Sequence, residues 1–97
     1  YLVDRASELD FAESFQRNRM PQSLPVLFGR VVRQRREAIA MSQETLGAQT
    51  ELSRNYIGMI ERGETNPTLL VLHGLAIALQ TTMSALISDL EAALDPP

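Results

Sequence analysis

The stretch 52-LSRNYIGMIERG-63 opens with Ser53, Arg54 and Asn55, three side chains that form directional hydrogen bonds. An arginine can donate two hydrogen bonds to a guanine, and an asparagine can both donate to and accept from an adenine. Ser53 is a good N-cap residue, so Arg54 and Asn55 fall in the first turn of a helix. Residues of these types at that position indicate hydrogen bonding to base edges by the front of a helix.

The remainder of this helix carries two further candidate contacts. Ile57 and Ile60 turn toward the core, whereas Gly58 lies on the outer face one turn after Arg54. A glycine there lets the backbone approach DNA closely, although it can also be only a weak helix position. Met59 could contact a thymine methyl group, but methionine is also a common filler of helix surfaces. We therefore predict a base-reading set: Ser53, Arg54, Asn55, Gly58 and Met59.

The sequence offers no comparable case for catalysis or metal binding. It contains no cysteine and a single histidine, His73, so neither a thiolate site nor a histidine cluster can hold a metal. It has no glycine-rich phosphate loop, no His-Glu-x-x-His pattern and no arrangement of His, Ser and Asp. His73 lies among leucines in the middle of a helical pattern, where we expect a partly buried packing role. We predict that the chain is not an enzyme and needs no cofactor.

Charge is distributed unevenly along the chain. The net charge of −3 argues against a nucleic-acid partner, but residues 24–62 hold six arginines against four glutamates. From Gly63 onward there are four acids and no base. A locally basic face can bind phosphates while the rest of a protein is acidic.

Membrane and export signals are not evident in the sequence. No apolar run reaches the length of a membrane-spanning helix, and no basic-then-apolar signal pattern opens the chain. The absence of cysteine is compatible with a reducing compartment. We expect a cytoplasmic protein without a membrane partner or an evident small-molecule ligand.

Helical signals dominate the chain, and strand signals are nearly absent. Apolar residues at helical spacing predict a helix over residues 1–19, followed by a break at 20–24. Proline at the first turn, polar N-caps and a glycine C-cap delimit the other helices. We expect these over Pro25–Ile39, from Ser42 to near Gln49, from Ser53 to before Gly63, over Leu69–Leu79 after Thr68, and over Met83–Ala93 after Thr82. We expect residues 1–22 to form an N-terminal helical extension and residues 23–97 to form the main domain.

The last two predicted helices carry more apolar surface than one small core needs. The segment 69-LLVLHGLAIAL-79 is apolar on nearly every side, and an apolar stripe continues through the helix that follows. Surplus apolar surface of this size is typical of an interface, so we expect a homodimer. The expected interface residues are Leu70, Ile77, Met83, Leu86, Leu90 and Leu94. Alternatively, the N-terminal helix covers this surface within one chain.

Two short helices joined by a tight turn, as expected over residues 42–62, form a helix-turn-helix candidate whose second helix would enter the major groove. The segments 28-FGRVVRQRREA-38, 41-MSQETLG-47, 52-LSRNYIGMIERGETNPTL-69 and 75-LAIAL-79 follow one another at characteristic spacings. In this combination the sequence resembles the Cro and lambda-repressor-like helix-turn-helix family, the XRE family, from Phe28 to Ile87. The resemblance implies an all-α, five-helix bundle, here with an additional N-terminal helix.

The resemblance also implies a role for individual residues. Arg54, Asn55 and Met59 occupy base-reading positions of the family. The implied phosphate contacts come from Ser42, Gln43, Tyr56, Arg62, Thr65 and Asn66. Arg36 and Glu61 match a pair that forms a structural salt bridge in this family.

Four positions depart from the usual pattern of the family. Ala40 and Glu51 stand where glycines are common, so the helix before Ala40 is expected to end differently. Gly47 replaces an alanine and suits close helix packing. Arg35 replaces a core leucine, so its stem is expected to pack while its charged end reaches water.

Together these features predict a sequence-specific DNA-binding transcription regulator, such as a repressor, that binds a palindromic operator as a homodimer. Its partners are double-stranded DNA and a second copy of the chain, with recognition helices ~34 Å apart. The alternative is an antitoxin-like or anti-regulator module that uses the same fold to bind another protein.

Overall fold

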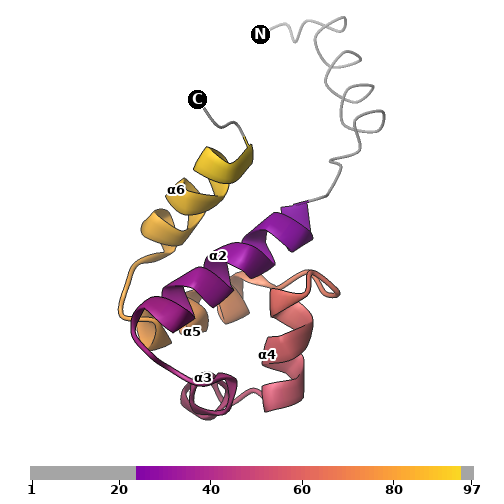
Figure 1. Cartoon of the computed structure of the whole chain (residues 1–97), viewed down its shortest axis with the longest axis vertical. Helices are drawn as coiled ribbons and strands as arrows, with labels where there is room; N and C mark the ends of the chain where they lie inside the picture. The colour runs from indigo at the N-terminus through magenta and orange to yellow at the C-terminus, as the bar shows by residue number, and fades with distance from the viewer. Residues whose placement is uncertain (1–23, 95–97) are drawn as a thin grey trace, which may run out of the picture.

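The computed structural model describes residues 24–94, which form five helices (Figure 1). They are α2 (Leu24–Ala38), α3 (Gln43–Thr50), α4 (Arg54–Glu61), α5 (Leu69–Ala78) and α6 (Met83–Leu94). No strand occurs within residues 24–94, so the all-helical prediction is confirmed for this part of the chain. The helix expected over residues 1–19 lies outside the described residues.

Polar caps start the helices at the predicted places. The side chains of Ser42, Ser53 and Thr68 each accept a hydrogen bond from the backbone N–H three residues further on. Thr82 does the same for Ala85, at 3.0 Å. Each side chain satisfies a backbone donor that has no partner inside its own helix, which fixes where the helix begins.

A residue with a left-handed backbone conformation, at positive φ, follows each of four helices. Gly63 takes φ 75° after α4, whereas three other turns use non-glycine residues: Ala40 at φ 54°, Glu51 at 62° and Gln80 at 63°. The expectation that the helix before Ala40 would end differently is wrong. The backbone N–H groups of Ala40 and Met41 still donate to the last turn of α2, each at 3.0 Å. These hydrogen bonds hold Ala40 in a conformation that costs a non-glycine residue about 1–2 kcal/mol.

Every helix contributes to one core. The largest fully buried side chains come from all five helices: Val32 of α2, Leu46 of α3, Ile57 and Ile60 of α4, Leu75 of α5 and Leu86 of α6. Helix α2 contacts both α4 and α6, while α3 packs against α4 and α5 (Figure 1). The core therefore fixes α3 and α4 relative to each other and to α2.

Two glycines allow backbones to meet closely around α3 and α4. A Cβ atom on Gly29 would lie only 2.6 Å from the carbonyl oxygen of Glu61 and closer still to that of Ile60. A Cβ atom on Gly47 would lie 2.8 Å from the carbonyl oxygen of Leu52, in the turn between α3 and α4. Any larger residue at either position would force these elements apart.

Helix α6 is attached to α2 by apolar and polar contacts. Leu86 and Leu90, expected at a subunit interface, are 0% and 7% exposed and belong to the core of the chain. That expectation is wrong for both residues, because the inner face of α6 packs against the rest of the chain. Arg35 adds hydrogen bonds from Nε to Asp89 at 2.8 Å and from Nη1 to Thr81 at 3.1 Å. Its charged end thus holds α6 instead of extending freely into water.

The outer face of α5 is exposed and apolar. Leu70 is 80% exposed and Ile77 is 64% exposed, and His73, expected to be partly buried, is exposed between them. Met83 is half-buried against the core, and Leu94 is exposed at the end of α6. No single helix among residues 24–94 is long and apolar enough to cross a membrane, but α5 and α6, bent by 103°, reach that length and composition as a pair.

Candidate nucleic-acid interface

The first turn of α4 projects polar side chains from a rigid base. Arg54 and Asn55 are exposed, while Ile57 and Ile60, further along the same helix, are fully buried. Ser53 caps this turn with a 2.9 Å hydrogen bond from the Tyr56 backbone N–H. The helix is thus fixed along its buried side, and its front presents a guanidinium and an amide to solvent.

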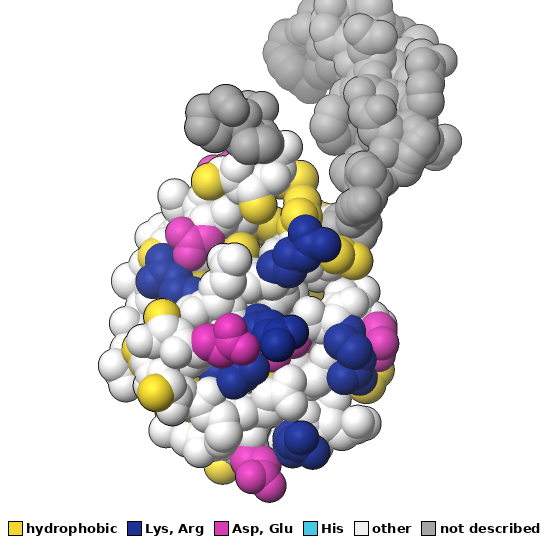
Figure 2. Space-filling model, viewed as in Figure 1, with side chains coloured by type: hydrophobic (Ala, Val, Ile, Leu, Met, Phe, Trp, Pro, Cys, Tyr) yellow, Lys and Arg dark blue, Asp and Glu magenta, His cyan; other side chains and the backbone are white. Residues whose placement is uncertain are grey.

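A polar hollow of about 530 Å³ lies where α2, α3 and α4 meet. It is lined by Arg33, Arg36, Ser42, Gln43, Glu44, Arg54, Glu61 and Arg62. Arginine side chains gather over these helices, with acidic side chains among them (Figure 2). Guanidinium groups and the N-terminal end of α3 at one surface favour the binding of anions such as phosphate.

An ion pair beside this hollow connects three elements. Arg36 donates to Glu61 through Nε at 2.7 Å and through Nη2 at 3.0 Å, and its Nη1 donates to the Met41 carbonyl at 2.8 Å. Gln43 donates to the same carboxylate at 3.0 Å. The Arg36 side chain is 11% exposed and that of Glu61 is 4% exposed. The hydrogen bonds to Glu61 raise the pKa of Arg36, so Arg36 stays charged and braces α2 against α4.

Arg62, directly after α4, lies back over Gly58. Its Nη1 would be 2.9 Å from a Cβ atom built on Gly58, which is buried rather than open on the outer face as expected. Arg62 also donates to Glu64 from Nε at 2.9 Å and from Nη2 at 3.2 Å. These hydrogen bonds raise the pKa of Arg62 and lower the pKa of Glu64. A carboxyl with a lowered pKa is ionised at neutral pH, so the charge pair is present there and is lost when acid protonates Glu64.

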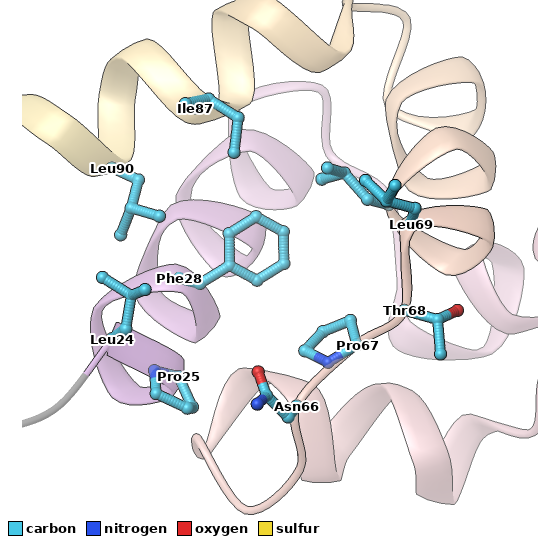
Figure 3. A pocket seen from close by; sticks show the side chains of 10 residues that line it. Leu24, Pro25, Phe28, Asn66, Pro67, Thr68, Leu69, Ile87 and Leu90 are labelled. Atoms are coloured by element: carbon cyan, nitrogen blue, oxygen red, sulfur yellow. The ribbon is translucent and has the colours of Figure 1, made fainter. Parts of the chain in front are cut away.

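The structure brings only some of the predicted contact residues together. The hollow collects the predicted residues of α2 and the start of α3, together with Arg54 and Arg62. Asn55 is exposed on α4, whereas Tyr56 and Met59 are half-buried against neighbouring residues. Thr65 and Asn66 do not line the hollow. Asn66 instead borders an apolar pocket of about 180 Å³ between the start of α2, the segment before α5, and α6 (Figure 3).

Two lining residues of the hollow were not among the predicted contacts: Arg33 and Glu44. Arg33 is exposed and pairs with Glu37 at 3.0 Å along α2. The sequence contained a signal for it, because Arg33 and Arg36 are three residues apart and share one face of a helix. Glu44 had no such signal beyond its position in the first turn of α3.

A capped helix that points exposed Arg and Asn side chains outward, braced against a preceding short helix, defines a helix-turn-helix protein. A family model described as helix-turn-helix matches residues 32–86 of this chain. The control protein C.MunI from a Mycoplasma species is 36% identical over 69 residues, which cover 70% of this chain and 93% of C.MunI. The chain therefore belongs to the XRE-type helix-turn-helix family and is a DNA-binding transcription regulator.

Solved structures agree with this assignment. The restriction-modification controller protein C.AhdI from Aeromonas hydrophila is 41% identical with a TM-score of 0.62, over 63% of this chain and 92% of C.AhdI. The clp gene regulator ClgR from Corynebacterium glutamicum has a TM-score of 0.71 at 18% identity, over 73% of this chain and 76% of ClgR. At that identity, the likeness to ClgR shows a shared fold and nothing further.

Proposed function

We propose that the chain binds a palindromic operator as a homodimer and regulates transcription from it. The observation that carries the proposal is the exposed Arg54 and Asn55 pair in the capped first turn of α4. These side chains would reach base edges in the major groove, and the second α4 of the dimer would enter the groove ~34 Å away. The proposed phosphate contacts come from the start of α3, from α4 and from the segment after α4: Ser42, Gln43, Tyr56, Thr65 and Asn66.

The apolar face of α5 supports the homodimer. Leu70 and Ile77, two turns apart, are 80% and 64% exposed. Gly74 lies between them, and a Cβ atom there would meet nothing within 4 Å. The helix backbone at Gly74 is therefore accessible to a second helix. Exposed apolar surface of this kind marks an interface, and a second copy of the same helix would cover it. Leu94 and the edge of Met83 could extend the contact, whereas Leu86 and Leu90 could not.

The genes under control are suggested by the relatives. C.MunI is a control protein, C.AhdI is a restriction-modification controller, and this chain covers more than nine-tenths of each. We therefore propose that this chain controls the transcription of a restriction-modification gene cluster. Such a role is regulatory and not catalytic, and it is carried out in the cytoplasm.

Selection of bound sequences from a random pool of double-stranded DNA tests these points together. A homodimer on a palindrome should enrich two inverted half-sites whose centres are separated by about one helical turn. Enrichment of a single half-site would contradict the dimer, and no enrichment would contradict sequence-specific binding. A stable complex with another protein and no operator binding would instead favour an antitoxin-like module.

A further inference from the structure

We propose that Arg62 hydrogen-bonds a base edge from the place beside Gly58 that a side chain at position 58 would otherwise fill. Glu64 orients its guanidinium. This inference rests on the DNA binding proposed above and adds a specificity-determining residue to it. It differs from the family expectation of a phosphate contact at Arg62.

The first observation is the path of the Arg62 side chain. Arg54, Gly58 and Arg62 follow one another at intervals of four residues and therefore lie along one side of α4. A Cβ atom on Gly58 would lie 2.9 Å from Nη1 of Arg62 and 3.7 Å from its Cζ. The guanidinium thus occupies the place of the missing side chain, on the same side as Arg54. Both arginines line the polar hollow, and Arg54 is one of the residues proposed above to reach base edges.

The second observation is the hydrogen bonding of this guanidinium. Glu64 accepts from Nε at 2.9 Å and from Nη2 at 3.2 Å, so both of its oxygens lie along one edge of the group. Within residues 24–94, Nη1 and the second N–H of Nη2 make no hydrogen bond, and Nη1 is the atom next to Gly58. Two roughly parallel N–H bonds match the O6 and N7 acceptors of a guanine.

The chemistry of the pair favours a base over a phosphate. A phosphate on Arg62 would lie next to the Glu64 carboxylate, and the two negative charges would repel each other. A guanine edge is neutral and needs only donors at a fixed angle. The pair is exposed, at 56% and 51% for the two side chains, so it adds little to the stability of the fold. Its proposed effect is to favour one orientation of the planar guanidinium before DNA binds.

Three substitutions separate this role from a general charge effect. R62K keeps the positive charge and removes the fork, and E64Q removes the carboxylate that orients it. G58A keeps Arg62 and moves its guanidinium, because the atom that a new Cβ would meet is the end of a flexible side chain. R30K serves as the matched control, since Arg30 is exposed on α2 and does not line the hollow.

The measurement is selection from a random DNA pool, followed by titration of the wild-type site and of its single-base variants. We expect R62K, E64Q and G58A to relax the preference for the same guanine in each half-site by roughly 10-fold. R30K should leave every preference unchanged. Far-ultraviolet circular dichroism of each variant would show that the helices are retained.

Three outcomes overturn the base-reading role of Arg62. If R62K and G58A leave the preference at every base pair unchanged, Arg62 does not read a base. If they weaken binding to all sequences equally, Arg62 is a backbone contact. If the wild-type chain itself enriches no sequence, the proposed function fails, and this inference fails with it.

Discussion

At the scale of single residues, Arg36 and Glu61 join α2 to α4. Their side chains are almost fully buried, and Glu61 also accepts from Gln43 of α3. We expect E61A to lower the free energy of unfolding by about 3–5 kcal/mol, because it removes the buried carboxylate that neutralises the charge of Arg36. Urea unfolding measures this change. The control is R33A, which breaks the exposed pair with Glu37 and should cost at most about 1 kcal/mol. Equal costs for the two variants would contradict the bracing role.

Glu51 is one of three non-glycine residues with a left-handed backbone conformation among residues 24–94. It ends α3 at φ 62°, a conformation that glycine adopts freely. We expect E51G to raise the free energy of unfolding by about 1 kcal/mol, again measured in urea. E51A removes the same charge but keeps a Cβ atom, so it should gain much less. A gain of similar size for E51A would assign the effect to charge and not to the backbone.

Residue-level reasoning from the sequence succeeded where the rule is local. Ser42, Ser53 and Thr68 are caps because of their own chemistry, and the structure places them as predicted. It failed for Gly58, because the side chain that covers this glycine belongs to a residue beyond the end of α4. No helical periodicity reports that Arg62 turns back along the helix.

At the scale of the helices, the approach of α3 to the following turn sets the angle of α4. A Cβ atom at position 47 would lie 2.8 Å from the Leu52 carbonyl oxygen, which is backbone and cannot turn aside. We expect G47A to cost about 1–3 kcal/mol, measured by thermal and urea unfolding. Q49A changes an exposed residue of the same helix and should remain within about 0.5 kcal/mol of wild type. A G47A protein as stable as Q49A would show that the turn can move.

The front of α4 carries the central prediction about DNA. We expect R54A to lose about 1–3 kcal/mol of binding free energy at one base position and to relax the preference there. Q43A, at the start of α3, should weaken binding to all sequences alike. Titration of both variants against single-base changes in the selected site measures the difference. An equal loss for R54A on every sequence would remove Arg54 from the base-reading set.

Within residues 24–94, the number and order of the helices followed from sequence patterns, but their apolar faces were only partly assigned. The stripe on α6 was visible in its spacing, yet spacing does not say whether the chain itself or a partner covers an apolar face. Leu86 and Leu90 are covered by the chain itself, whereas Leu70 and Ile77 are not covered by any described residue. The contact between α2 and α6 buries Leu86 and Leu90, and this contact could not be read from the spacing of apolar residues.

For the molecule as a whole, the main expectation concerns its oligomeric state. Replacing both Leu70 and Ile77 with serine should shift the proposed dimer toward monomer in sedimentation velocity, because it removes apolar surface that a second copy would bury. The unfolding free energy of the monomer should change little, since both side chains are largely exposed. The control is I39S, because Ile39 is 37% exposed and lies just after α2, away from the apolar face of α5. This variant should leave the mass unchanged. An unchanged mass for the double variant would place the interface elsewhere.

The left-handed turns have a consequence for the amount of protein in the cell. Ala40, Glu51 and Gln80 each close a helix in a conformation that glycine would adopt with less strain, and each costs about 1 kcal/mol. Differences of about 1–2 kcal/mol change protein abundance several-fold, because cellular proteases remove the unfolded fraction. The occupancy of an operator depends on the concentration of its regulator. Substitutions in these three turns would therefore alter gene expression by changing how long the regulator survives.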